Sequence, residues 1–285
     1  MQHRLDAPIP AVRLADGTDV PALGMGTWHM GDTARRRPRE LAALRAGIAS
    51  GMTLVDTAEM YANGGAEEVL GEAVAGRRDD VFIVSKVYPH NAGAKSALLA
   101  CERSLRRLRT DRLDLYLLHW RGRIPLAETV DAFERLRRDG KIVRWGVSNF
   151  DTDDIEELLA LPDGAHCAVN QVLYHLGERG IEWSLAPLCR AHGIALMAYS
   201  PVGEGALLKD PELRRIARSV GARPAQLALA WLIRRDGVIA IPQTSNVAHI
   251  AENRGATNVE LSAATLAEID AAFPPPRRAT RLAVI

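Results

Sequence analysis

A regular alternation of strand-like and helix-like segments runs through most of this 285-residue chain and limits the folds that it can adopt. Short apolar runs typical of buried strands recur eight times, at residues 22–27, 53–56, 81–86, 113–119, 144–148, 167–171, 194–199 and 238–242. Segments with helical periodicity separate them, the clearest at residues 95–109, 126–138 and 224–235. Eight strands alternating with helices over about 250 residues is the pattern of a (β/α)8 TIM barrel, which we predict at about residues 22–273.

Two short segments flank the predicted barrel. Strand-like residues on either side of an Asp16-Gly17 turn predict an N-terminal β-hairpin at about residues 11–20, a lid that precedes the main fold. After residue 273 only the proline- and arginine-containing tail 274–285 follows, which leaves little chain for a long loop over a binding pocket. We therefore expect one barrel domain over residues 1–285, with an open pocket.

The rival architecture for an α/β chain is a doubly wound sheet, which normally carries a G-x-G-x-x-G phosphate turn after its first strand. Residues 24–29 begin as G-x-G, but His29 stands where the third glycine belongs. The second G-x-G, at residues 203–205, fails in the same way because position 208 is a leucine. The missing turn favours the barrel.

The composition of the chain limits which binding partners and which cellular compartment we expect. A formal net charge of +1 gives no reason to expect a nucleic acid. Cys101, Cys167 and Cys189 lie far apart with no C-x-x-C pair, so we expect buried thiols in a reducing compartment. Residues 1–10 lack the apolar core of a signal peptide, and no apolar stretch approaches the ~20 residues of a membrane span. These features predict a cytoplasmic protein without a membrane partner.

The histidines show no H-x-x-x-H or H-x-E spacing, so we expect no metal site.

Polar residues end several of the predicted strands. Asp56, Lys86 and His119 close three successive strands, and Tyr61 follows Asp56 in the same loop. The active site of a β/α barrel is built at the carboxyl ends of its strands, so these side chains should be neighbours.

This set of four residues suits the reduction of a carbonyl group. Tyr61 could donate the proton, but a free tyrosine has a pKa near ~10, too high for efficient acid catalysis at neutral pH. We expect the Lys86 cation to lower that pKa, Asp56 to keep Lys86 charged, and His119 to donate to the carbonyl oxygen. Each residue taken singly could equally be a cap, a salt-bridge partner or a packing group. Their joint occurrence on successive strand ends favours catalysis.

The segments around these residues resemble those of the aldo-keto reductase family, from Gly24 to about Phe273. The resemblance rests on residues 24–28, 56–61, 84–87, 114–120 and 146–150. It implies an NAD(P)H-dependent oxidoreductase that reduces small aldehydes or ketones to alcohols. The catalytic tetrad would be Asp56, Tyr61, Lys86 and His119, with Tyr61 as general acid, Lys86 and Asp56 tuning it, and His119 orienting the carbonyl. The overall sequence is similar to those of bacterial family members that act on small aldehydes, methylglyoxal among them.

The resemblance further implies a nicotinamide dinucleotide bound without a glycine-rich turn. Ser148, Asn149 and Gln171 match the positions that hold the nicotinamide carboxamide, and Tyr199 matches the ring that stacks on it. The full set of cofactor positions is Gly26, Thr27, Trp28, Asp56, Ser148, Asn149, Gln171, Tyr199, Ser200, Pro201, Val202, Gly203, Gln243, Thr244, Ser245, His249, Glu252 and Asn253. The substrate pocket would be framed by Trp28, Met60, Tyr88 and Trp120, an apolar rim that suits small aldehydes.

The chain departs from the family pattern at the positions expected to bind the adenosine part of the cofactor. Gln243 and His249 stand where the family usually has a lysine and an arginine. A 2′-phosphate prefers such cations because charge-assisted hydrogen bonds are roughly twice as strong as neutral ones. We therefore expect NADPH as cofactor with weakened selectivity, so that NADH is used as well.

The residues by themselves also allow two other functions. A lysine at a strand end could form a Schiff base, which would make the protein an aldolase acting through Lys86. A protein that keeps the cofactor site but turns over negligibly would be a regulatory or sensing subunit. The resemblance favours a monomeric enzyme acting on a small-molecule carbonyl compound.

Overall fold

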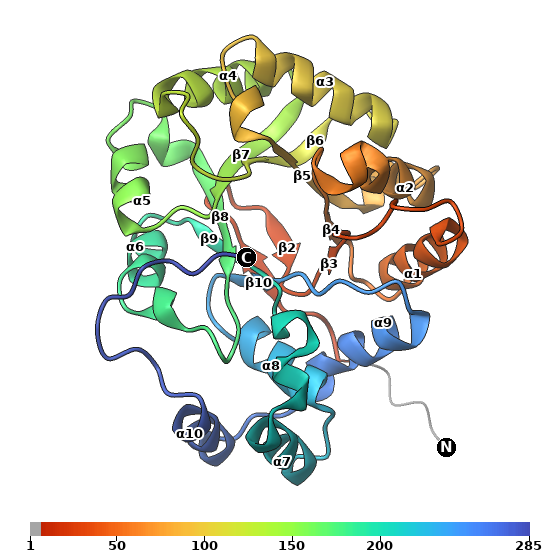
Figure 1. The fold of residues 1–285 in the computed structure, drawn as a ribbon, viewed down its shortest axis with the longest axis vertical. Helices are drawn as coiled ribbons and strands as arrows, with labels where there is room; N and C mark the ends of the chain where they lie inside the picture. Colours follow the sequence, from red (N-terminus) through yellow and green to blue (C-terminus); the bar gives the residue numbers. More distant parts are fainter. Residues whose placement is uncertain (1–6) are drawn as a thin grey trace.

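Eight parallel strands surround a central core in the computed structural model, which describes residues 7–285 (Figure 1). Neighbouring strands pair in the order β10-β9-β8-β7-β6-β5-β4-β3. Parallel bridges from Leu23 to Ala240 and from Gly26 to Gln243 join the two outer strands and close the barrel. The strands are β3 (Met25–Gly26), β4 (Leu54–Asp56), β5 (Phe82–Val87), β6 (Leu113–Leu118), β7 (Ile142–Ser148), β8 (Cys167–Leu173), β9 (Ala195–Tyr199) and β10 (Val238–Ala240). The predicted (β/α)8 barrel is confirmed.

Helices surround the barrel on its outer side (Figure 1). The three clearest helical predictions correspond to α3, α4 and α8, and their bounds agree with the structure to within two residues. The helices are α1 (Arg37–Ala49), α2 (Gly65–Ala73), α3 (Ser96–Leu108), α4 (Leu126–Arg138), α5 (Thr152–Leu159), α6 (Leu185–Ala191), α7 (Pro211–Ser219), α8 (Pro224–Ile233), α9 (Val247–Arg254) and α10 (Ala263–Ala272). Among the described residues, no helix is both long and apolar enough to cross a membrane.

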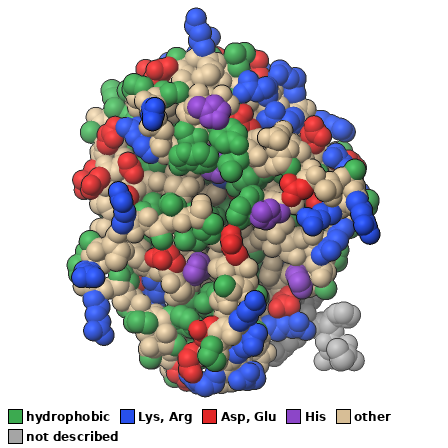
Figure 2. All heavy atoms as spheres, viewed as in Figure 1, with side chains coloured by type: hydrophobic (Ala, Val, Ile, Leu, Met, Phe, Trp, Pro, Cys, Tyr) green, Lys and Arg blue, Asp and Glu red, His purple; other side chains and the backbone are tan. Residues whose placement is uncertain are grey.

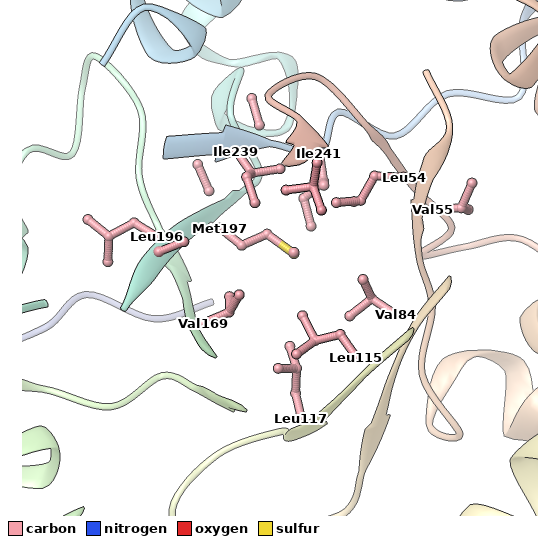
Figure 3. Close-up of a cluster of buried hydrophobic side chains, with 14 of the residues drawn as sticks. Leu54, Val55, Val84, Leu115, Leu117, Val169, Leu196, Met197, Ile239 and Ile241 are labelled. Atoms are coloured by element: carbon pink, nitrogen blue, oxygen red, sulfur yellow. The ribbon is translucent and has the colours of Figure 1, made fainter. Parts of the chain in front are cut away.

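Side-chain alternation along the strands decides which residues reach the barrel mouth. In Figure 3 Leu54 and Val84 point toward the barrel axis, whereas Val55 points outward. Successive side chains of a strand alternate between its two faces, so the residue two positions after each inward leucine or valine also faces the axis. This places Asp56 after Leu54 and Lys86 after Val84 on the inner side, at the carboxyl ends of their strands.

The N-terminal hairpin closes the opposite end of the barrel. Its strands β1 (Ala11–Arg13) and β2 (Asp19–Pro21) pair antiparallel, with Val12 opposite Val20 and both side chains buried. Asp16 in its turn forms an ion pair with Arg144, which lies near the start of β7. The predicted hairpin is confirmed, and it covers the amino-terminal end of the barrel. The three cysteines are free and buried, as expected.

The carboxyl-terminal tail crosses the barrel mouth. After α10 the chain runs back over the barrel, and Figure 1 shows the C-terminus near its centre. The Leu282 amide donates to Asp151 Oδ2 at 2.9 Å, and Ile285 is part of the lining of the mouth cavity. Even a short tail therefore contributes one residue, Ile285, to the cavity wall, and the open pocket stays a prediction.

Candidate active site

The ends of β4 and β5, with the loop after β4, bring an aspartate, a lysine and a tyrosine together at the barrel mouth. Lys86 Nζ lies 2.7 Å from Asp56 Oδ2, 2.9 Å from the Thr57 carbonyl oxygen and 3.1 Å from the Tyr61 hydroxyl oxygen. The Lys86 side chain is 0% exposed and the Asp56 side chain 3% exposed. The expected contacts between these residues are therefore present in the fold.

The hydrogen bonds of Lys86 fix the direction of the Tyr61 proton. An ammonium group has three donors and no acceptor, and all three donors of Lys86 are engaged. Lys86 therefore donates to the Tyr61 oxygen, and the phenolic proton must point elsewhere. Tyr61 lines the mouth cavity, where a substrate oxygen could accept this proton.

Burial is the largest influence on the pKa values of Tyr61, Lys86 and Asp56. It raises the pKa of Tyr61, and the Lys86 cation offsets this rise only in part. The expectation that Lys86 brings the pKa of Tyr61 below its ordinary value was therefore wrong for the protein alone, because the desolvation of a buried phenolate outweighs one nearby cation. Burial by itself would lower the pKa of Lys86, but the Asp56 carboxylate and Tyr61 raise it. Burial also raises the pKa of Asp56 against the opposing Lys86 charge.

His119 stands beside Tyr61 as a neutral imidazole. Their rings meet edge to face with centroids 5.8 Å apart. Burial and then the Lys86 cation lower the pKa of His119 to about 2. Its Nδ1 is buried without a hydrogen-bond partner among the described residues. A neutral imidazole lining a cavity can donate a hydrogen bond to a carbonyl oxygen but does not deliver a full proton near neutral pH.

Amide and hydroxyl groups extend the site toward the next strands. Gln171 Nε2 donates to Asp56 Oδ1 at 2.8 Å, and Ser148 Oγ donates to the Gln171 carbonyl oxygen at 2.9 Å. Asn149 Nδ2 donates to the His119 carbonyl oxygen at 3.1 Å, and the Tyr199 hydroxyl donates to Asn149 Oδ1 at 2.9 Å. One network therefore joins the tetrad to the predicted carboxamide-binding residues.

A strand irregularity places Ser148 opposite Gln171. The register between β7 and β8 shifts between Trp145 and Val147, so that Val147 pairs with Asn170. Gly146 lies at the shift, where a Cβ would collide with the carbonyl oxygen of Val169. A bulge of this kind redirects side chains at the rim of a barrel.

A cavity of about 650 Å³ extends from the tetrad to residues 243–253. Most predicted site residues line it, whereas Thr27, Lys86, Tyr88, Gly203 and Ser245 are absent from its lining. Sequence reasoning missed several others that do line it: His29, Glu204, Gly205, Leu208, Ala225, Ile241, Pro242 and Ile285. These lack a chemical signal in the sequence, since most are apolar or glycine and reach the cavity only through the fold.

The substrate end of the cavity has an apolar rim. Trp28, Met60 and Trp120 are 36%, 36% and 37% exposed, high values for side chains of this size. Tyr88 does not line the cavity, but its ring contacts that of Trp120 edge to face, with centroids 5.9 Å apart. Figure 2 shows hydrophobic and histidine side chains near the centre of this face and Lys and Arg mainly around its periphery. The arrangement suits a small, uncharged substrate.

The far end of the cavity is formed by the loop before α9. Asn246 caps this helix by accepting from the Ala248 amide at 3.0 Å, and Thr244 Oγ1 accepts from the Asn246 amide at 3.1 Å. Gln243, Thr244 and His249 line the cavity here, as do Glu252 and Asn253. Among the residues that the structure describes, no lysine or arginine lines any part of it.

A second group of titratable side chains lies away from the cavity. Potential ligand atoms of Glu134, Asp163 and His166 lie within 4.8 Å of one another, although sequence spacing gave no sign of this cluster. Glu134 already accepts from Trp145 Nε1 at 2.7 Å and from Arg137 at 2.7 Å. Because the Glu134 carboxylate already accepts these hydrogen bonds, we interpret it as a structural group and not as a metal ligand.

Comparisons with known proteins agree with this site. The sequence pattern described as the Aldo/keto reductase family matches residues 22–273. Methylglyoxal reductase YeaE of Escherichia coli (strain K12) is 52% identical over 279 residues, which cover 96% of this chain and 98% of that protein.

Two solved structures of aldo-keto reductase from Klebsiella pneumoniae are similar along nearly the whole chain. One, in complex with NADP and acetate, has a TM-score of 0.94 at 52% identity and covers 98% of this chain and 100% of its own. The other, in complex with NADPH, has a TM-score of 0.95 at 51% identity, with the same coverage.

Proposed function

The chain belongs to the aldo/keto reductase family, and from this premise we propose that it reduces small aldehydes or ketones to alcohols with NADPH. The observation that carries the proposal is the Tyr61 hydroxyl, which accepts from Lys86 at 3.1 Å and lines a cavity with an apolar rim. A general acid must lie within reach of the group that it protonates, with its proton free to transfer.

Each residue of the tetrad would have a separate role in the reaction. When bound, NADPH would supply the hydride for the carbonyl carbon. The carbonyl oxygen takes a proton from Tyr61, whose raised pKa keeps the phenol protonated before the reaction. As negative charge develops on the Tyr61 oxygen, the Lys86 cation stabilises it, and Asp56 holds that cation in place. Neutral His119 donates to the same carbonyl oxygen and orients it.

The residues present fit a nicotinamide dinucleotide at the site. Ser148, Asn149 and Gln171 offer the donors and acceptors that a carboxamide requires, and the cavity continues from them to residues 243–253. Tyr199 would stack on the nicotinamide ring, and Gln243 and Thr244 would face the adenosine part. With Gln243 and His249 in place of cations, we propose that NADH is also used.

The substrate class that we propose is small neutral aldehydes, with methylglyoxal as the first candidate. An apolar rim without lysine or arginine offers no partner for an anionic substrate. The 52% identity to an enzyme named methylglyoxal reductase supports the same choice.

The Schiff-base alternative fits the geometry poorly. Imine formation needs a free amine, whereas Lys86 is fully buried, donates three hydrogen bonds and has a raised pKa. The sensing-subunit alternative remains an outcome of the test below.

The test is cofactor oxidation by the purified protein, with NADPH and NADH in parallel, against methylglyoxal and an aromatic aldehyde. Tyr61→Phe is the matched variant, which we expect to lose about a hundredfold or more in turnover while its cofactor affinity stays nearly unchanged. Substantial activity in Tyr61→Phe would refute the assignment of the acid. Tight cofactor binding without turnover of any aldehyde would favour the sensing subunit.

Dissociation constants for NADPH and NADH test the dual cofactor use. A preference for NADPH above about a hundredfold, or about 2.7 kcal/mol, would refute it.

We also propose a monomeric enzyme of the cytoplasm. The three free, buried cysteines suit a reducing compartment. Size-exclusion chromatography with light scattering tests the monomer, and a mass corresponding to a dimer would overturn it. Fractionation of the source cells tests the compartment, since recovery of the protein outside the cytoplasm would contradict the proposal.

A further inference from the structure

The cavity proposed to hold NADPH carries acidic groups and no cation of its own. Glu204 and Glu252 line it, and no lysine or arginine does so among the described residues. NADPH differs from NADH by one 2′-phosphate on the adenosine ribose. Acidic groups disfavour a phosphate, so a cation from outside the cavity wall would favour NADPH over NADH.

Two arginines border the adenosine end of the cavity. Arg223 Nη1 lies 3.0 Å from Glu252 Oε2, so its charge is already matched by a carboxylate. Arg39 lies on α1, far from this region in sequence, and its Nε donates to the Ser245 carbonyl oxygen at 2.8 Å. Within residues 7–285, no carboxylate lies within salt-bridge distance of the Arg39 guanidinium. Of these two arginines, Arg39 is the one whose charge is not matched by a carboxylate of the described residues.

The packing of two helices brings Arg39 to this loop. α1 and α9 lie side by side in the fold (Figure 1). Ser245 belongs to the loop that precedes α9, between Thr244, which lines the cavity, and the capping residue Asn246. One nitrogen of the guanidinium anchors the side chain on this loop, and the other two carry donors without a partner in the described part of the chain. A guanidinium with free paired donors is suited to bidentate contact with a phosphate.

We propose that Arg39 is a specificity residue for NADPH and binds the 2′-phosphate from α1, in place of the cations missing at positions 243 and 249. This inference rests on the proposed use of NADPH. Arg39 is exposed, so its contribution is moderate, which is consistent with the use of both cofactors. Sequence alignment of the loop would not reveal such a residue, because it comes from a different helix.

The test is calorimetric or fluorescence titration of the full-length protein with NADPH and with NADH. We expect Arg39→Ala to weaken NADPH binding about tenfold, or about 1.4 kcal/mol, and to change NADH binding by less than about twofold. Arg39→Lys keeps the charge and should lose less. The control is Arg35→Ala, which removes an exposed arginine whose side chain forms no hydrogen bond or ion pair with the loop among the described residues. We expect it to leave both affinities unchanged.

Two further measurements separate a phosphate contact from a general effect. Gln243→Lys introduced into Arg39→Ala should restore NADPH affinity, because it supplies a new cation at the same loop. Adenosine 2′,5′-bisphosphate should bind more weakly to Arg39→Ala than to the parent protein, whereas ADP should not. Both readouts are independent of catalytic turnover.

The outcomes distinguish this inference from the proposed function. NADPH and NADH affinities that fall equally in Arg39→Ala, or that do not fall at all, overturn the role of Arg39 and leave the reductase intact. A parent protein that binds neither dinucleotide overturns the reductase proposal itself. Retained NADH affinity in Arg39→Ala shows that the variant is folded.

Discussion

Replacing His119 by glutamine tests whether the imidazole beside the acid is neutral. Its folded-state pKa of about 2 lies well below the unfolded value near 6.5. Between these values the unfolded chain binds the additional proton, so His119 makes stability fall as pH decreases below about 6.5. From about pH 7 to about pH 5 this loss amounts to about 2 kcal/mol, because each pH unit below the unfolded pKa costs about 1.4 kcal/mol.

The assay is urea unfolding of the parent protein and His119→Gln at both pH values. We expect the parent to lose about 2 kcal/mol more than the variant between them. His192→Gln, at an exposed histidine, is the control for the loss of one imidazole and should behave as the parent does. Equal losses in the parent and in His119→Gln would refute the neutral state, and with it the role of His119 as an uncharged donor to the carbonyl.

Three other substitutions test separate parts of the argument. Asp56→Asn removes the charge that raises the pKa of Lys86, so the alkaline limb of the pH profile of kcat should move to lower pH; an unchanged profile would count against Asp56 as the tuning group. Gly146→Ala forces a methyl group against the Val169 carbonyl and should cost about 3 kcal/mol in urea unfolding, whereas an unchanged midpoint would show that the bulge tolerates it. Gln243→Lys alone should tighten NADPH binding about tenfold in titrations without changing NADH binding, and a parallel gain for NADH would contradict the phosphate contact.

The ionisation of the tetrad shows where pairwise reasoning was insufficient. The sequence placed Lys86 beside Tyr61 and therefore predicted a lowered pKa of the phenol. In the folded protein Lys86 is fully buried and Tyr61 is half-buried, and for Tyr61 the loss of hydration outweighs the attraction of the Lys86 cation. The Lys86 cation still favours the phenolate relative to an equally buried tyrosine without it, so its proposed role in catalysis stands.

The substrate side shows a similar division between prediction and structure. Trp28, Met60 and Trp120 are large apolar residues next to polar strand ends, and they line the cavity as expected. Tyr88 belongs to the same sequence pattern but contacts Trp120 without lining the cavity. The direction of a side chain that follows a strand depends on the turn in between, which the pattern of residue types does not specify.

The sequence by itself determined the barrel and the catalytic set. Hydrophobic periodicity is local, so the strands and the main helices could be located, and the carboxyl ends of parallel strands necessarily meet at one face of a barrel. The sequence alone therefore places Asp56, Lys86 and His119 together. Only the tertiary structure brought Arg39 to the loop of Ser245 and Ile285 into the cavity, because these contacts join segments separated by much of the chain. Such contacts depend on how helices and tails pack, and no local pattern of residues encodes that packing.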